Sequence, residues 1–130
     1  MLVTPLFAAL FGILYFLLSI NVVRHRLTKQ VSLGDGEDRY VQRAIRIHAN
    51  FIEYVPLLLV LFYFYEIMSL SGSLVFVLGA SLLVARVCHV IGMLKPKQFI
   101  VLRQIGALVT FSVLLIISLA LAIHYLPVSV

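Results

Sequence analysis

The sequence predicts an all-α integral membrane protein, built as a bundle of four transmembrane helices without a soluble module. Of its 130 residues, 63% are hydrophobic and 12% are charged, whereas soluble domains are about 45–50% apolar. A membrane-spanning helix needs about 20 mostly apolar residues to cross a hydrocarbon core about 30 Å thick. Runs of this kind occur four times, so we expect residues 1–130 to form one domain with helices at about 2–24, 38–69, 72–94 and 100–126.

The first apolar run, from Leu2 to Val23, contains no charged residue. A secretion signal carries positive charge before its apolar core, whereas here Arg24 and Arg26 follow the run. We therefore expect a retained helix with its amino end outside.

The second run, about Ile47 to Met68, follows the acidic, glycine-containing segment SLGDGEDRY. Asp35 or Asp38 in this segment is the expected cap of the helix. Pro56 lies further along and has no amide hydrogen, so we expect it to interrupt or kink the helix.

The remaining two runs are Gly72 to Leu94 and about Ile105 to Leu126. Arg86 and His89 interrupt the first of them, and the second has no Lys, Arg, Asp or Glu. The single cysteine, Cys88, cannot form an intrachain disulfide, and we expect it to be a packed apolar residue.

The ten basic residues lie in or beside the first and third connections, or approach them from within a helix. By the positive-inside rule these two connections are cytoplasmic, and both termini lie outside. The net charge of +5 is therefore concentrated on one membrane face. We expect Lys29, Lys95 and Lys97 to contact membrane lipids. We expect no nucleic-acid partner.

Polar residues follow a regular spacing through the start of the second helix. At 100° per residue they fall within an arc of roughly 80° and so form one stripe: Arg39, Arg43, Arg46, Asn50 and Glu53. His48 points in nearly the opposite direction and belongs to another surface.

The depth of this stripe decides how it is interpreted. Glu53 lies seven residues beyond Arg46, or about 10 Å deeper, where an ionised group costs about 2.5–3.5 kcal/mol unless it faces protein or water. Arg86 lies at a similar depth, about 12 Å from the cytoplasmic end of the third helix, and His89 shares its face broadly. One interpretation is an internal Glu–Arg pair that joins helices. This pair explains Glu53, but it leaves the other basic residues of the stripe without a role.

The other interpretation is a cytoplasm-facing pocket, to which Arg24 and Arg103 add positive charge. Guanidinium groups bind carboxylates, and Glu53 can accept from an ammonium group. A small anionic ligand with an amine fits this chemistry. Glutathione, an amino acid, a nucleotide and a lipid headgroup are all compatible with it.

The segments RAIRIHANFIEYVP and VARVCHVIGML, together with the GDG turn, resemble the MAPEG family, the membrane-associated proteins in eicosanoid and glutathione metabolism. The resemblance is to the short bacterial branch, with its signature AIRIHxNxxEYxP, and covers essentially the whole chain. It implies a four-helix bundle in the bacterial inner membrane that assembles as a homotrimer and binds glutathione between subunits near the cytoplasmic side.

The resemblance also implies roles for individual residues. The expected glutathione contacts are Arg24, Arg46, Asn50, Glu53 and His89, with Arg43 and Arg86 as supporting charges. Arg103 aligns, with a one-residue shift, with the arginine that stabilises the glutathione thiolate in catalytic members. Two positions depart from the pattern of those members: Met93 replaces a tyrosine, and Gln104 replaces a serine.

The expected function is that of a glutathione transferase or peroxidase acting on lipophilic electrophiles or lipid hydroperoxides. A non-catalytic membrane protein that binds lipid or glutathione is the alternative. A small transporter is disfavoured, because the chain has neither repeats nor pairs of broken helices. No metal is expected, because the histidines have no ligand spacing.

Overall fold

The computed structural model describes residues 2–68 and 72–126 and is all-helical in this part of the chain. Its helices are α1 (Thr4–Lys29), α2 (Arg39–Ile67), α3 (Gly72–Leu94) and α4 (Ile100–Tyr125). All four are long and apolar enough to cross a membrane. The predicted fold class, an all-α membrane protein with four transmembrane helices, is confirmed.

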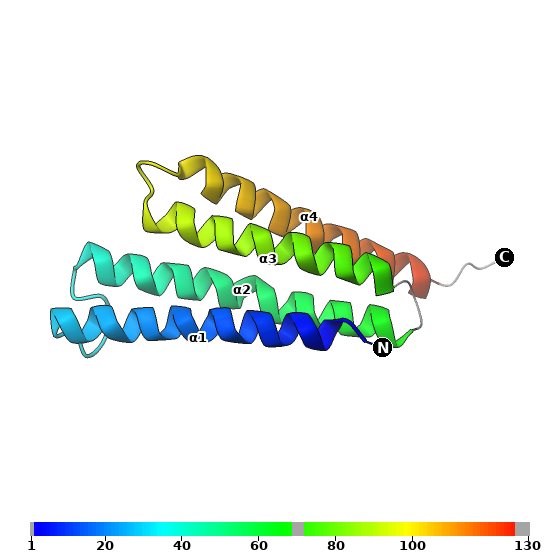
Figure 1. Cartoon of the computed structure of the whole chain (residues 1–130), viewed down its shortest axis with the longest axis horizontal. Coiled ribbons are helices and arrows are strands. Elements are labelled where there is room, and N and C mark those ends of the chain that lie inside the picture. Colours follow the sequence, from blue (N-terminus) through cyan, green and yellow to red (C-terminus); the bar gives the residue numbers. More distant parts are fainter. Residues whose placement is uncertain (1, 69–71, 127–130) are drawn as a thin grey trace.

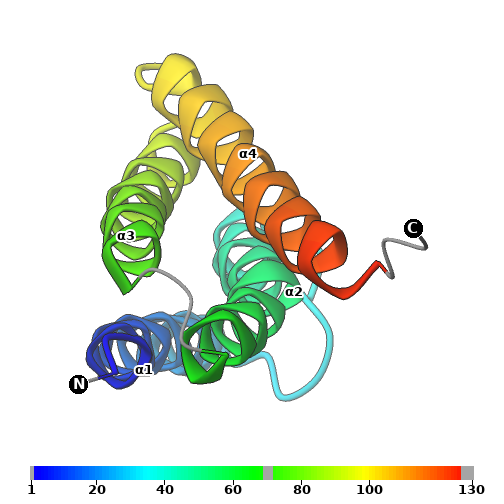
Figure 2. The ribbon, with the colours of Figure 1, turned by 90° about the vertical axis from the view of Figure 1, so that its right-hand side faces the viewer.

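The helices run alternately up and down the long axis of the molecule (Figure 1). The connections 30–38 and 95–99 lie at one end, which we call the basic end. The start of α1, the end of α2, the start of α3 and the end of α4 lie at the opposite end. Viewed along the axis, α1 lies beside α2, and α3 lies beside α4 (Figure 2).

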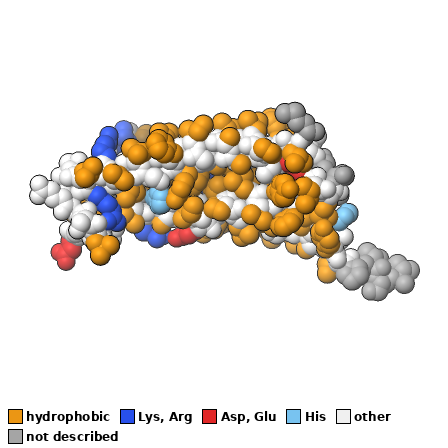
Figure 3. All heavy atoms as spheres, turned by 90° about the horizontal axis from the view of Figure 1, so that it is seen from below, with side chains coloured by type: hydrophobic (Ala, Val, Ile, Leu, Met, Phe, Trp, Pro, Cys, Tyr) orange, Lys and Arg blue, Asp and Glu red, His pale blue; other side chains and the backbone are white. Residues whose placement is uncertain are grey.

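The core contains buried apolar side chains from all four helices. Phe11 of α1 and Phe51 of α2 are buried, with ring centroids 6.1 Å apart, and Leu82 and Ile117 bring α3 and α4 into the same cluster. Hydrophobic side chains also cover most of the length of the outer surface, whereas Lys and Arg gather at the basic end (Figure 3). This is the distribution expected of a bundle surrounded by lipid.

The boundaries differ from the sequence-based ones mainly in α1, which continues to Lys29 instead of ending near residue 24. Basic residues such as Arg24 and Arg26 do not end a helix, because their favourable place is its last turn. The helix ends where Gln30 takes a left-handed backbone conformation, with φ of 56°. Position 69, the expected end of the second helix, lies outside the described residues.

The expected interruption of the second helix at Pro56 is not found, because α2 is continuous from Arg39 to Ile67. Proline removes one backbone hydrogen bond, and membrane helices tolerate this loss where neighbouring helices support them. Val55 and Leu58, on either side of Pro56, are both buried in the core. Packing therefore holds the helix together through the proline.

A buried carboxylate ties the start of α1 to the end of α2. Glu66 is 7% exposed, and its two carboxylate oxygens accept from the backbone N–H groups of Val3 and Thr4, each at 2.7 Å. These amides have no partner within α1, because the first turn of a helix leaves its donors free. Glu66 thus caps α1 from another helix.

Two glycines allow α3 and α4 to pack closely. A Cβ atom on Gly106 of α4 would lie 2.5 Å from the carbonyl oxygen of Ala85 and 2.8 Å from the backbone nitrogen of His89. A Cβ atom on Gly92 of α3 would lie 2.8 Å from the carbonyl oxygen of Phe99. Small residues allow such close approach in membrane helices, and here they set the position of α4 relative to His89.

Candidate functional site

The polar stripe begins at the first turn of α2, directly after the helix cap. Asp38, and not Asp35, is the cap: its carboxylate accepts from the N–H groups of Tyr40 and Val41 at 2.8 Å and 3.1 Å. The N–H of Val41 and the nearby Lys29 ammonium, whose nitrogen lies 3.2 Å from the carboxylate, hold the pKa of Asp38 below its ordinary value. The helix start, and with it the register of the stripe, is therefore anchored.

Two members of the stripe form an ion pair on the exposed face of α2. We call this face, which carries Arg46 and Glu53, the open side of α2. A guanidinium nitrogen of Arg46 lies 3.8 Å from a carboxylate oxygen of Glu53. Both side chains are largely exposed in the single chain, at 56% and 47%. The pair presents a cation and an anion side by side on the face of α2 that carries the polar stripe.

Asn50, between them on the stripe, contacts α3. Nη2 of Arg86 donates to Oδ1 of Asn50 at 2.8 Å, so the two lie at one level along the bundle, as the depth argument predicted. Arg86 is 1% exposed, and its guanidinium carbon lies 5.7 Å from the centre of the Phe51 ring. Because a guanidinium only donates, this bond leaves the amide N–H groups of Asn50 available as donors.

His89 lies one turn further along α3 and is 5% exposed. Within the described residues, Nδ1 of His89 and Nε of Arg86 are buried and have no hydrogen-bond partner. The close contact of His89 with Gly106 places it near the first turns of α4, where Arg103 is exposed. Buried polar groups without partners are rare in folded proteins, and these two lie on adjacent turns of one helix.

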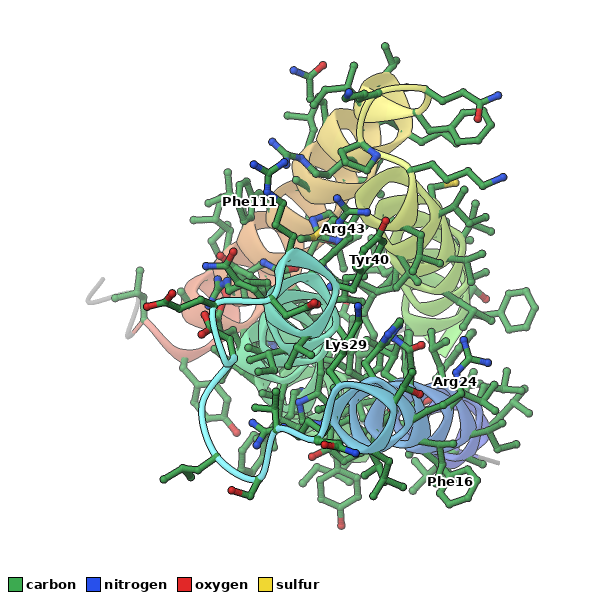
Figure 4. The ribbon with its side chains drawn as sticks, turned by 90° about the vertical axis from the view of Figure 1, so that its left-hand side faces the viewer. Phe16, Arg24, Lys29, Tyr40, Arg43 and Phe111 are labelled. Atoms are coloured by element: carbon green, nitrogen blue, oxygen red, sulfur yellow. The ribbon has the colours of Figure 1, made fainter. Side chains whose placement is uncertain are left out.

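Arg43 and Arg24 lie nearer the basic end. Arg43 extends from α2 toward α3 (Figure 4), where its Nη1 donates to the carbonyl oxygen of Leu94 at 3.2 Å. Arg24 extends from α1 and is exposed. No hydrogen bond or ion pair joins the Arg24 side chain to the other site residues in the described part of the chain.

His48 lies on a different surface from the stripe, as its position on the helix predicted. Its Nε2 lies 3.2 Å from the hydroxyl oxygen of Ser19, and its ring centroid lies 4.9 Å from that of Tyr15, both on α1. This histidine therefore joins α1 to α2, away from Asn50 and Arg86.

The sequence matches the model of a known protein family. A model of the MAPEG family matches residues 4–123. This chain belongs to the MAPEG family. The family comprises membrane proteins of eicosanoid and glutathione metabolism, which agrees with the membrane-spanning helices.

Two curated relatives of this MAPEG protein carry the same name, "Inner membrane protein YecN". One is from Escherichia coli strain K12 and the other from Escherichia coli O6:H1 strain CFT073. Each is 35% identical over 125 residues, which cover 96% of this chain and 93% of the relative. No solved structure matches the chain significantly.

The two departures from the pattern of catalytic MAPEG members lie at the same end of the molecule. Met93 is partly buried and packs against the apolar core, and Gln104 is exposed beside Arg103. In the described residues, no group of three His, Cys, Asp or Glu side chains is placed to hold a metal ion.

The structure adds a role that sequence reasoning did not assign. Arg86 was expected only as a supporting charge, but it is the direct partner of Asn50 and is the largest fully buried side chain. An arginine in an apolar run signals that a partner must exist. The sequence did not indicate which residue that partner is.

Proposed function

We propose that this MAPEG protein binds glutathione against the open side of α2, near the basic end, as the co-substrate of a transferase or peroxidase. The observation that supports this most directly is that Arg86 is buried without a carboxylate partner among the described residues. Its guanidinium is buried, and no carboxylate lies within 4.0 Å of it in the described part of the chain. A buried cation without a counter-charge is costly, so the site favours an anion.

The neighbouring groups favour a ligand that also carries an ammonium group. Arg46 offers a guanidinium for a carboxylate, Glu53 can accept from an amine, and Asn50 directs its amide donors away from Arg86. Glutathione has two carboxylates and one amine and can use all of these groups. His89 and Arg24 complete the proposed set of glutathione contacts, and Arg43 supports it with a further positive charge.

In the chemical step the protein must favour the glutathione thiolate. A free cysteine thiol has a pKa of about 8.5, so only a small fraction is ionised at neutral pH. Arg103 is the proposed stabilising group, with Arg24 as the second candidate, because a nearby cation favours the anion.

The second substrate is proposed to be a lipophilic molecule that reaches the sulfur from the bilayer. In conjugation, the thiolate sulfur bonds to an electrophilic carbon while the leaving group departs with its electron pair. In hydroperoxide reduction, two glutathione molecules are oxidised to the disulfide, while the hydroperoxide is reduced to an alcohol and water.

We further propose that the protein is a homotrimer of the bacterial inner membrane, with the basic end in the cytoplasm and both termini outside. The name of the relatives supports the location, and the gathering of Lys and Arg at one end supports the orientation (Figure 3). The exposed Arg46–Glu53 pair supports an oligomer, because it needs cover from a neighbouring subunit or from water.

Isothermal calorimetry of glutathione with the detergent-purified protein tests the binding site. We expect Arg46→Ala and Glu53→Ala each to weaken binding about tenfold or more, since a charge-assisted hydrogen bond is worth about 1.5–3 kcal/mol. The control is His48→Ala, which removes a polar group from the opposite side of α2 and should leave binding unchanged. Equal losses from all three variants would contradict the assignment to a single face.

Turnover is tested separately with glutathione and an aryl halide, or with a lipid hydroperoxide. We expect product to form above the uncatalysed rate and this rate to fall when Arg103 is replaced by Ala. Glutathione binding without turnover would instead identify a non-catalytic binding protein, the alternative that Met93 and Gln104 keep open.

A further inference from the structure

A second cationic feature lies at the basic end and shares only Arg43 with the polar stripe. A depression of about 300 Å³ opens between the first turns of α2 and the connection that follows α3. It is lined by Arg43, Leu94, Lys95, Pro96, Lys97 and Gln98. The three charged residues in this lining are all cations, so the depression is suited to an anion.

Arg43 is held in place within this depression. Its Nη1 donates to the carbonyl oxygen of Leu94 at 3.2 Å, and its guanidinium carbon lies 6.0 Å from the centre of the Tyr40 ring. A single bond to a carbonyl uses only part of a guanidinium, which has five N–H donors. Arg43 is therefore oriented in advance and still able to bind a phosphate oxygen. Figure 4 shows Arg43 and Tyr40 together at the centre of this end of the bundle.

The position of the depression fits the headgroup level of a membrane. It lies where α3 ends, and Lys95 and Lys97 are exposed there. Below it, apolar side chains face outward from the same part of α3 and from the start of α4: Ile91 is 40% exposed, Leu94 45% and Ile100 40%. A molecule with a phosphate and acyl chains could contact the cations and this apolar surface together.

We propose that this depression binds the phosphate group of an anionic phospholipid. Arg43, Lys95 and Lys97 contact the phosphate, and the acyl chains lie along Ile91 and Leu94. The apolar surface beside the cations favours a lipid over free phosphate, which would use only the charged lining. The inference does not depend on glutathione binding.

Native mass spectrometry of the detergent-purified protein tests this proposal, with phosphatidylglycerol and phosphatidylcholine of identical acyl chains as probes. We expect the wild-type protein to retain phosphatidylglycerol in preference to phosphatidylcholine. The double variant Lys95→Gln/Lys97→Gln should lose affinity for phosphatidylglycerol by about tenfold or more, because each Lys near an anionic surface contributes appreciably to binding.

The matched control is Arg26→Gln/Arg39→Gln, which removes the same charge from the same end of the molecule but outside the depression. It should keep the preference for phosphatidylglycerol. Equal losses in both double variants, or no preference in the wild-type protein, would overturn the proposal. Complete displacement of the lipid by millimolar inorganic phosphate would also overturn it, since the site would then be one for a soluble anion.

Discussion

Arg86 illustrates how one buried charge organises the candidate site. Its side chain is 1% exposed, donates to Asn50 and lies over the ring of Phe51. The sequence predicts that a charge in this part of the third helix needs a partner, and it places Asn50 at a comparable depth. The pairing itself requires that the two helices face each other at this level, which helical periodicity along a single chain does not determine.

The first prediction compares the two partners of this hydrogen bond. Asn50→Ala should lower the free energy of unfolding in detergent by about 1.5–3 kcal/mol, because it leaves a buried guanidinium without its acceptor. Arg86→Met should cost less, because it removes the charge together with its desolvation penalty. Both variants should lose glutathione affinity, as measured by calorimetry.

Ser112→Ala provides the control for this comparison. Ser112 is exposed, and its hydroxyl donates to the carbonyl of Leu108 in its own helix. The free energy of unfolding should therefore change by no more than about 0.5 kcal/mol. A larger loss of stability in Arg86→Met than in Asn50→Ala would show that the bond to Asn50 is not what holds Arg86.

Contacts between different helices cap α1 and bring α3 and α4 close together. At the end opposite the basic end, Glu66 of α2 caps α1. Between α3 and α4, Gly92 and Gly106 permit close approach. The sequence predicted where each helix lies because the length of an apolar run is a local property. It did not predict these contacts, because each joins segments that are distant in the chain.

The second prediction concerns the cap on α1. Glu66→Ala should remove both acceptors and expose the amides of Val3 and Thr4 to hydrogen exchange, while lowering stability by about 1.5–3 kcal/mol. Hydrogen exchange followed by mass spectrometry of the first helical turn measures the effect. Glu37→Ala, in the exposed connection before α2, removes the same charge and should leave the protection of α1 unchanged.

The third prediction uses two glycines in helices with different surroundings. Gly106→Ala introduces a Cβ atom against the backbone of α3 and should cost about 1–3 kcal/mol through overpacking. Gly12→Ala introduces a Cβ atom with nothing within 4 Å and should be neutral or stabilise by up to about 1 kcal/mol. Thermal unfolding in detergent compares them, and an equal response would contradict the close α3–α4 contact.

At the scale of the whole molecule, the main question is what covers the open side of α2. Arg46 and Glu53 are exposed on the single chain, although Glu53 lies about 10 Å deeper along the helix than Arg46. Ionised groups at such depth face protein or a water-filled cavity. A neighbouring subunit, together with a bound ligand that carries both a carboxylate and an ammonium group, would satisfy both members of the pair.

The fourth prediction is the oligomeric state. Native mass spectrometry in a mild detergent should give a particle of three chains, each of 14.6 kDa, and chemical cross-linking in membranes should give the same number. The protein unfolded in denaturing detergent serves as the monomer reference. A monomer in both experiments would contradict the proposed trimer and leave the Arg46–Glu53 pair to be covered by water alone.

The sequence by itself determined the fold class, the four membrane spans, the single face of the polar stripe and the opposite face of His48. These features depend on the length of apolar runs and on helical periodicity, and both are properties of a local stretch of sequence. Only the tertiary structure decided that Arg86 donates to Asn50, that Glu66 caps α1 and that Gly106 lies against His89. Periodicity says which side of a helix a residue occupies, but the packing of the bundle selects the neighbour it meets there.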